Sequence, residues 1–230
     1  MPIIQDEEFG KITIRRSARA TQVRLRVAPD GTLRASLPLY APTFLVKRLI
    51  KSSRDELRTL LEHSQPKVVY ENGMHIGKSH TLIIEPSLGT FTATRRGQQI
   101  IVRLPEHKSV SDSTVVRTIR DAIIAALRVE AKAYLPKRLS FLAEKYGFRY
   151  TKVRFSHASG RWGSCNNQGT ISLNIALMKL PFELIDYVII HELAHTKQLN
   201  HSLEFWELVS IGDPQYKQHR RALKQEIPTI

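Results

Sequence analysis

Hydrophobic and polar residues alternate one for one in the first part of the chain, which is the pattern of strands with one buried face. The alternation is regular in "VRLRV" at 23–27, and a second such run, "TLRASLP", follows the sequence "PDG" at 29–31. Asp-Gly between two alternating runs is typical of a hairpin turn. Further strand-like runs, "KVVY", "HTLIIE", "TFTAT" and "QQIIVRLP", occupy 67–104. Residues 1–108 are therefore expected to form a β-rich unit that also contains short helices.

Apolar residues take up helical spacing in two longer segments. Residues 42–63 predict two short helices that separate near Ser52–Ser53, and residues 112–146 predict one long amphipathic helix that Gly147 ends. The buried stripe of the short helices is expected to consist of Leu45, Leu49, Leu57, Leu60 and Leu61. Two short strands follow the long helix, and the chain shows neither an internal repeat nor a low-complexity segment. These elements indicate an α+β fold.

The segment "HELAHTKQLNH" holds three of the nine histidines of the chain. It continues a helix that starts at Pro181, where the missing N–H has no intrahelical role. His191 and His195 are four residues apart, so their rings lie on one face, as two ligands of a tetrahedral zinc ion require. Glu192 lies beside the first ligand and can accept a proton from a water molecule at the metal. Because "YVIIHELAH" is apolar enough to be buried, a bound metal also explains polar residues there.

The third ligand is expected to be His201, with Glu204 and Glu207 on the next helix as rivals. Asn200 is suited to the left-handed conformation that ends a helix, and Ser202 is suited to cap the helix that follows. The spacing is close to the metzincin signature, H-E-x-x-H-x-x-G-x-x-H. However, Gln198 stands at the glycine of that signature, and no methionine follows Met178. The chain is therefore not a metzincin.

The motifs "RWGSC", "ISLN", "LPFELIDYVIIHELAH" and "NHSLEFW" occur in this order. In this the chain resembles the YgjP-like family of zinc metallopeptidases, which is related to SprT-like and WLM proteases. The resemblance implies a minimal zincin fold for residues 109–230, one Zn²⁺ per chain, His191, His195 and His201 as its ligands, and Glu192 as the catalytic base. Leu199 departs from the proline that the family often has there. Nucleotide pyrophosphatase activity has been attributed to some members.

The loop and strand before the metal-binding helix supply candidate substrate-binding residues. In zincins an edge strand above the metal pairs with an extended peptide, and the strand 170–174, which ends at Asn174, is the candidate for that role. Arg161 is suited either to stabilising an oxyanion or phosphate, or to pairing with Glu183 or Asp186. Trp162 is a candidate for the wall of the cleft, or else for the core.

The 35 Lys and Arg residues exceed the 21 Asp and Glu residues, giving a net charge of +14 that is spread over both halves of the chain. Such a charge favours polyanionic partners, although it is also what a merely soluble basic surface would show. One cysteine, Cys165, cannot form an internal disulfide, and no apolar run reaches membrane-spanning length. The start of the chain is acidic, unlike a signal peptide. A cytoplasmic protein without a membrane partner is expected.

Three functions are compatible with these residues. The preferred one is a zinc-dependent metallopeptidase that acts on peptides or proteins. The first alternative is a metal-dependent pyrophosphatase of nucleoside triphosphates, whose substrate the basic surface would recruit. The second is a nucleic-acid-associated module with a structural zinc. A structural site closes with four protein ligands and has no use for Glu192, which counts against this last function.

Overall fold

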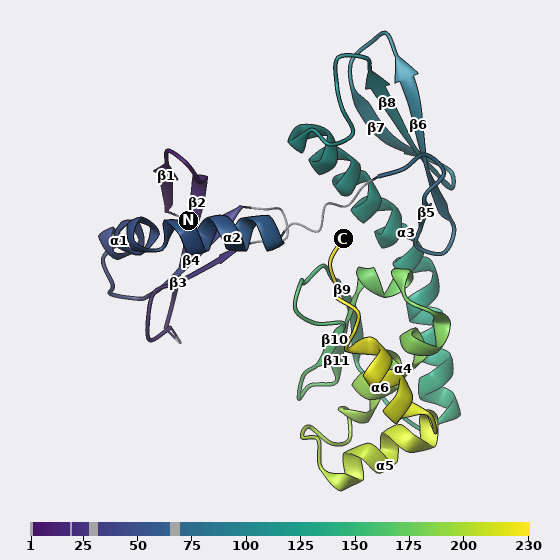
Figure 1. Cartoon of the computed structure of the whole chain (residues 1–230). Coiled ribbons are helices and arrows are strands. Elements are labelled where there is room, and N and C mark those ends of the chain that lie inside the picture. Colours follow the sequence, from purple (N-terminus) through teal and green to yellow (C-terminus); the bar gives the residue numbers. More distant parts are fainter. Residues whose placement is uncertain (1, 19, 28–31, 65–69) are drawn as a thin grey trace. The chain divides into compact units, whose positions relative to one another are not determined.

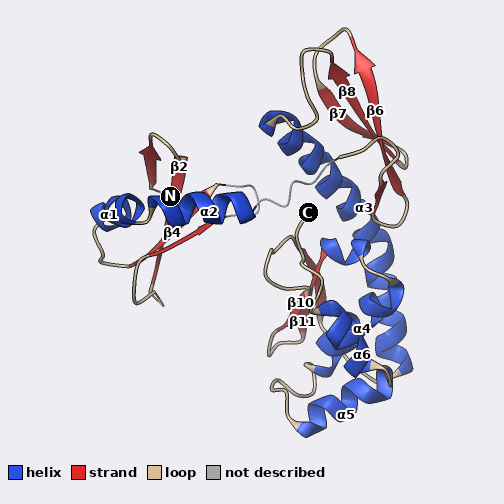
Figure 2. Ribbon diagram, viewed as in Figure 1, coloured by secondary structure: helices blue, strands red, loops and turns tan. Residues whose placement is uncertain are grey.

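The computed structural model describes residues 2–18, 20–27, 32–64 and 70–230, and the chain forms two compact units, Met1–Val69 and Tyr70–Ile230. Both units combine helices with a four-stranded sheet, which confirms the expected α+β class (Figures 1 and 2). The boundary between the two units follows residue 69, and not residue 108 as the sequence predicted. The physical reason is that the second sheet shares one hydrophobic core with the long helix that follows it.

The first unit contains β1 (Ile3–Asp6), β2 (Gly10–Ser17), β3 (Arg24–Val27), β4 (Leu33–Pro38), α1 (Phe44–Ser52) and α2 (Arg54–Ser64). The strand order is β1-β2-β4-β3, with β2 and β4 parallel and the outer pairs antiparallel. One face of the sheet and the two helices enclose a core that includes Ile12, Ile14, Leu33, Leu37, Val46 and Ile50. The turn predicted at 29–31 and most of the strand predicted at 67–70 lie outside the described residues.

The short helices separate at Ser53, as predicted, and Leu57 and Leu61 of α2 pack in the core as expected, but the buried stripe of α1 is different. Val46 and Ile50 are buried, whereas Leu45 and Leu49 are only partly buried and the side chain of Leu60 is half exposed. The stripe therefore lies one residue further along α1. The positions of the leucines predicted the wrong stripe, because the β-branched residues Val46 and Ile50, which are of similar hydrophobicity, face the sheet instead.

The second unit begins with β5 (His75–Ile76), β6 (His80–Ser87), β7 (Thr92–Arg96) and β8 (Gln99–Pro105), followed by α3 (Ser113–Lys145). The strand order is β5-β6-β8-β7, and β6 and β8 are parallel. Leu82, Ile100 and Val102 pack with Val115 and Ile119 of α3. Figure 1 shows that α3 runs from this sheet to the helices at the other end of the unit.

The two four-stranded sheets have the same topology, so a repeat exists in the fold that the sequence did not show. Both β4 and β8 end in Leu-Pro, at Pro38 and Pro105. When these prolines are placed in correspondence, Leu33 and Ala35 of β4 match Ile100 and Val102 of β8, all four of them buried. The pairing registers with neighbouring strands then coincide as well, since Leu25 and Ala93 pair with Ala35 and Val102.

A buried carboxylate fastens the second sheet to α3. Glu130 of α3 accepts hydrogen bonds from the backbone N–H groups of Lys78 and Ser79, from the Ser79 hydroxyl, and from His80 Nδ1 at 2.6 Å. Gly77, at φ +65°, approaches so closely that a Cβ there would lie 2.2 Å from Glu130 Oε2. The turn between β5 and β6 is thus held to the helix by charge-assisted hydrogen bonds.

The rest of the second unit comprises β9 (Lys152–Ser156), β10 (Gly163–Cys165), β11 (Thr170–Asn174), the 3₁₀ helix η1 (Ile175–Lys179), α4 (Phe182–Ala194), α5 (Leu203–Gly212) and α6 (Tyr216–Leu223). The strand order is β10-β11-β9. The strand 170–174, expected at the edge, is therefore the central one, because β9 pairs with it in parallel on its other side. The edge strands of this sheet are β10 and β9, and β10 is the one that lies against Glu192. Within the part of the chain that the structure describes, no helix is long and apolar enough to cross a membrane.

Candidate metal centre

The first two histidines are positioned by α4, an apolar helix of the second unit. Leu184, Val188, Ile189 and Ile190 bury most of its circumference against α3 and the small sheet. His191 lies in its last turn and His195 directly follows its last residue. The rings lie with centroids 4.9 Å apart. The helix therefore presents both side chains at one end, as their spacing predicted.

The chain then turns back through residues 195–201. Thr196, Lys197 and Gln198 donate backbone hydrogen bonds to carbonyls in the last turn of α4. Asn200 does not adopt the expected left-handed conformation, since all described residues with positive φ are glycines. These hydrogen bonds continue the helical winding, so the reversal needs no residue of that kind. Ser202 caps α5 as predicted, with its side chain accepting from the Phe205 N–H.

The turn brings the ring of His201 to the other two. Each of the three histidines offers a ring nitrogen within 4.8 Å of the others. His201 Nε2 lies 3.3 Å from His191 Nε2. Two nitrogen ligands of a tetrahedral zinc ion at about 2.05 Å are expected to lie about 3.3 Å apart. The separation therefore fits a shared metal ion. Glu204 and Glu207, the rivals of His201, do not belong to this cluster.

The surroundings of His191 and His195 favour neutral imidazoles, the form that binds a metal. Burial, with the charges of His195, His201 and Arg220, lowers the pKa of His191 to about 3. His195 also has a lowered pKa, chiefly because of burial. Its Nδ1 lies 3.0 Å from the Gln198 carbonyl oxygen, which can only accept, so Nδ1 carries the proton. That tautomer leaves the lone pair of His195 on Nε2, available to a metal.

Aromatic side chains of α5 hold the three rings in place. Phe205 is fully buried, and its ring lies within 4.5–4.9 Å, centroid to centroid, of all three histidine rings. The Trp206 ring stacks on His201 at 5.7 Å and on Tyr216 at 5.4 Å. Phe205 and Trp206 thus pack against the ligand-bearing turn. Both residues restrict the rotamers of the imidazoles, which preorganises the cluster.

Glu192 projects from α4 toward β10 and is buried. Burial raises the pKa of Glu192 to about 8, against the opposing charge of Arg161. Among the described residues, Glu192 Oε2 has no hydrogen-bond partner. A Cβ at Gly163 would lie 2.5 Å from Glu192 Oε1, so only glycine leaves room for the carboxylate. A buried, unpaired carboxylate is costly unless a ligand completes its surroundings.

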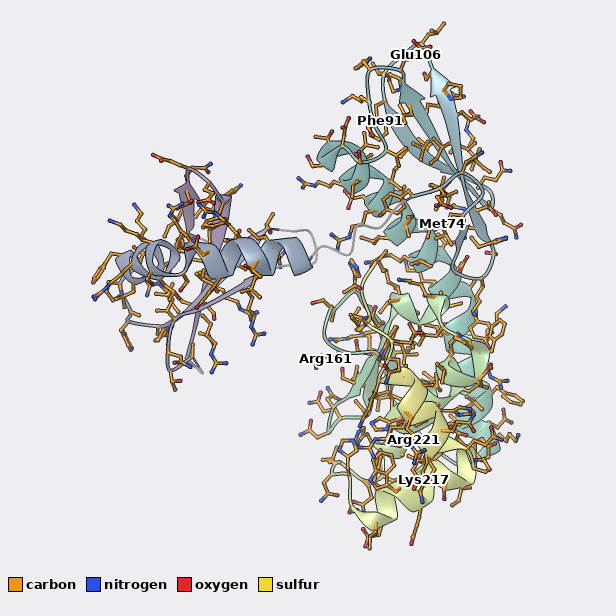
Figure 3. The ribbon with its side chains drawn as sticks, in the orientation of Figure 1. Met74, Phe91, Glu106, Arg161, Lys217 and Arg221 are labelled. Atoms are coloured by element: carbon orange, nitrogen blue, oxygen red, sulfur yellow. The ribbon has the colours of Figure 1, made fainter. Side chains whose placement is uncertain are left out.

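The three candidate substrate-binding residues, Arg161, Trp162 and Asn174, differ in their surroundings. Arg161 is exposed in the loop before β10 (Figure 3), and within the described residues its side chain makes no hydrogen bond or salt bridge. Asp186, a suggested partner of Arg161, instead forms a bidentate pair with Arg138. Trp162 is partly buried against the core.

Asn174 is fully buried. Its Nδ2 donates to the carbonyls of Ala158 and Arg161, and its Oδ1 accepts from the Ala176 N–H. Both N–H groups of the side chain are thus used within the chain. Asn174 holds the 158–161 loop, and so positions Arg161 from behind.

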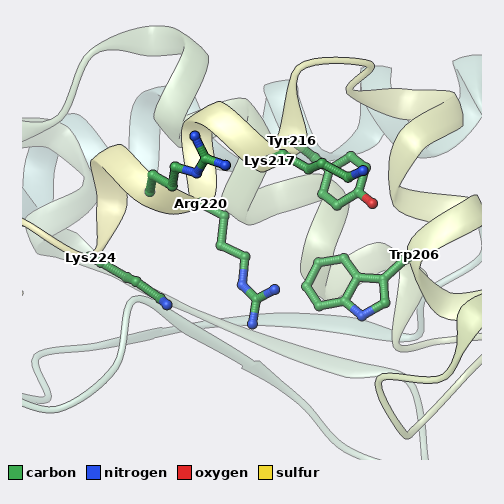
Figure 4. A pocket seen from close by; sticks show the side chains of 6 residues that line it. Trp206, Tyr216, Lys217, Arg220 and Lys224 are labelled. Carbon is green, nitrogen blue, oxygen red and sulfur yellow. The ribbon is translucent and has the colours of Figure 1, made fainter.

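A pocket of about 320 Å³ borders the cluster on the α6 side (Figure 4). Its lining comprises Trp206, Tyr216, Lys217, Arg220, Arg221 and Lys224. The Arg220 guanidinium lies 4.6 Å from the centroid of the Trp206 ring, which also stacks on His201. Four cations therefore surround a cavity that shares one wall with the histidine cluster.

Two parts of this neighbourhood escaped sequence reasoning. Gly163 stands within "RWGSC", and a glycine inside a strand, a known mark of close approach, was the available signal. His219 is mostly buried, and its Nδ1 lies 2.7 Å from Oδ2 of the buried Asp213. The Tyr187 ring contacts both His219 and His191. No spacing rule links residues 187, 213 and 219, so only the fold reveals this group.

Three converging histidines, an adjacent buried glutamate and a neighbouring edge strand define a metal-dependent hydrolase of the H-E-x-x-H class. The chain belongs to the YgjP-like family, since the model of the YgjP-like metallopeptidase domain matches residues 21–226. Membership implies a divalent metal ion and makes the protein a metal-dependent peptidase at the level of its family. A comparison with curated proteins returned no match.

Among solved structures, the crystal structure of the metallopeptidase zymogen of Pyrococcus abyssi abylysin is similar to this chain. The two are 28% identical in sequence, and the match covers 39% of this chain and 92% of that one, with a TM-score of 0.36.

Proposed function

We propose that the protein is a zinc-dependent peptidase with one Zn²⁺ per chain, held by His191, His195 and His201, and with Glu192 as its general base. The observation that supports this most directly is the buried Glu192 carboxylate, whose Oε2 has no partner among the described residues, beside three imidazoles whose nitrogens are spaced for one ion. Zinc, when bound, supplies a Lewis acid that polarises a carbonyl group and acidifies water.

The residues of the chain then divide the remaining tasks. Glu192 takes a proton from the attacking water at Oε2 and passes it to the leaving amine. The outer edge of β10, which pairs with no other described strand, offers backbone groups to an extended peptide as an added strand. Arg161 places a positive charge near the carboxylate and is suited to stabilising the developing oxyanion.

The test is peptide release from a mixture of unfolded proteins by the zinc-loaded protein, followed by mass spectrometry. Glu192→Gln is the blank, and Glu207→Gln, on the exposed side of α5, is the matched control for loss of one glutamate charge. We expect fragments from the unsubstituted protein and from Glu207→Gln but not from Glu192→Gln, with zinc bound in all three. Fragments that persist in Glu192→Gln would rule out this base.

One observation favours a second candidate, the hydrolysis of a nucleotide phosphoanhydride. The pocket beside the histidines is lined by Lys217, Arg220, Arg221 and Lys224, which suits a polyphosphate. Nucleoside triphosphates therefore belong in the same assay, with release of phosphate or pyrophosphate as the readout. If this candidate is right, Arg221→Gln with Lys224→Gln lowers nucleotide hydrolysis at least about tenfold, as expected for lost charge-assisted contacts. Release of peptides alone would remove it.

A further inference from the structure

The first sheet exposes the face that α1 and α2 do not cover, and this face is strongly cationic. Residues that pair directly across neighbouring strands lie on the same face of a sheet. On this face β4 pairs with β2 through Thr13–Arg34 and Arg15–Ser36. It pairs with β3 through Arg24–Ser36 and Arg26–Arg34. The five cations that share this face, here named the cationic face, are all exposed: Lys11, Arg15, Arg24, Arg26 and Arg34. No acidic residue of β1 to β4 lies on this side in the described part of the unit.

This arrangement is unfavourable for an isolated sheet. Arg26 lies directly opposite Arg34, and like charges in that position repel each other. Outside this face, Arg54 and Arg58 pair with Glu8 and Asp55. Lys11, Arg15, Arg24 and Arg26 concentrate positive charge on one exposed face, which suits a partner of opposite charge.

The second sheet provides an internal control, because it has the same topology and register. The positions that correspond to Lys11, Arg15, Arg24, Arg26 and Arg34 are occupied by Thr81, Glu85, Thr92, Thr94 and Ile101. That face also carries Arg96 and Arg103, and Arg103 pairs across from Glu85. The fold thus forms without the five cations, so they are not needed to build it.

We propose that the cationic face binds the sugar-phosphate backbone of nucleic acid, and of duplex in preference to single strands. Regularly spaced arginines and a lysine suit a row of phosphates, which they neutralise with release of counterions. No aromatic residue lies on this face among the described strands, so the stacking on which single-strand binding depends is not provided. Binding is therefore insensitive to base sequence and strongly dependent on salt. Nothing in this inference depends on the metal centre.

The test uses the full-length protein, a fluorescent 20-base-pair duplex, and affinities measured across a series of salt concentrations. The test variant is Lys11→Thr with Arg24→Thr and Arg26→Thr, which installs the residues of the second sheet. The matched control, Lys47→Gln with Arg48→Gln and Lys51→Gln, removes three exposed cations from α1, on the other side of the same sheet. Arg24→Lys with Arg26→Lys keeps the charge and is expected to bind as the unsubstituted protein does.

If the proposal holds, the threonine variant loses at least about tenfold in affinity at low salt. The slope of log K against log salt concentration also becomes shallower by about 2 to 3, because each lost phosphate contact contributes roughly 0.9. The α1 variant keeps most of its affinity, and a single strand of the same length binds more weakly than the duplex. Equal losses in both variants would overturn the proposal, as would an absence of duplex binding. Equal binding to heparin or to phosphatidylserine vesicles would overturn the assignment to nucleic acid.

Discussion

The two four-stranded sheets of this protein share strand order and register but differ in what surrounds them. In the first unit the sheet is covered by the separate helices α1 and α2, and its open face carries five cations. In the second unit one continuous helix, α3, covers the sheet and extends to the elements that hold the histidine cluster. One architecture therefore serves two purposes, a charged surface in one unit and a support for a metal centre in the other.

The difference shows that a sheet's buried face and its exposed face are subject to separate constraints. At matching core positions both sheets keep apolar residues, Leu33 and Ile100 among them, because the strands must bury one face. The opposite faces have diverged from Arg26 and Arg34 to Thr94 and Ile101. Divergence of the solvent-facing half conceals the repeat from inspection of the sequence.

The largest expected effect is a loss of peptidase activity when a single glycine of the second unit is replaced. Gly163→Ala is expected to lower peptidase activity about 10²-fold, because the new Cβ displaces the Glu192 carboxylate, and displacements near 1 Å cost that much. Gly160→Ala, in the same loop with open space around its Cβ position, is the control and should remain active. Rates and zinc content are measured for both. Full activity in Gly163→Ala would show that Glu192 does not need this placement.

The turns between the first two strands of each sheet offer a direct comparison. Gly10 and Gly77 both have positive φ, so alanine costs about 1–2 kcal/mol at either position. At Gly77 the Cβ also meets Glu130, which adds about 1–3 kcal/mol by disturbing its hydrogen bonds, whereas Gly10 has nothing within 4 Å. Urea unfolding, resolved by hydrogen exchange, should show the larger loss in Gly77→Ala. Equal losses would mean that Glu130 moves aside freely.

Acid is expected to lower the stability of the second unit, because it protonates the Glu130 carboxylate. Burial alone would raise the pKa of Glu130, but hydrogen bonds from His80, Lys78 and Ser79 outweigh it and hold the pKa below 4.5. A lowered folded-state pKa means that this stabilisation is present above about pH 4.5 and is lost as the pH falls through the folded value. Thermal unfolding at pH 7 and in acid should thus show a smaller acid-induced loss in Glu130→Gln, itself about 1–3 kcal/mol less stable at pH 7. Parallel pH profiles would contradict this account.

The smallest effect concerns the exposed faces. Arg26→Thr should stabilise the first unit by about 0.2–1 kcal/mol, since it removes a like charge directly opposite Arg34. Arg103→Thr is the control in the second sheet, where the lost charge lies opposite Glu85, and it should not stabilise. Hydrogen exchange of the strand amides measures both. A loss of stability in Arg26→Thr would show that the cations support the fold.

Much of the metal centre follows from local spacing. His191, Glu192 and His195 lie within one helical turn and a half, so the helix alone sets their relative positions. The reversal to His201 was also predictable, because Ser202 begins a new helix. The central place of β11 was not, since which of two neighbouring strands lies at an edge depends on the parallel pairing of β9.

Asn174 illustrates why the substrate-facing residues were harder to predict than the ligands. A polar residue at the end of a strand near a site can bind a substrate or hold a neighbouring loop. Only the positions of the Ala158 and Arg161 carbonyls show that Asn174 holds the loop. The same limit applies to Gly163, whose requirement for glycine comes from a carboxylate 29 residues away in the sequence.

The sequence by itself determined the α+β class, the long helix, and the helix-borne histidines with their glutamate, because periodicity and short spacings are local properties of the backbone. Tertiary structure alone decided the unit boundary, the repeated sheet, the edge strand and the glycine over Glu192. Each of these depends on contacts between residues distant in sequence, whose partners no local pattern identifies.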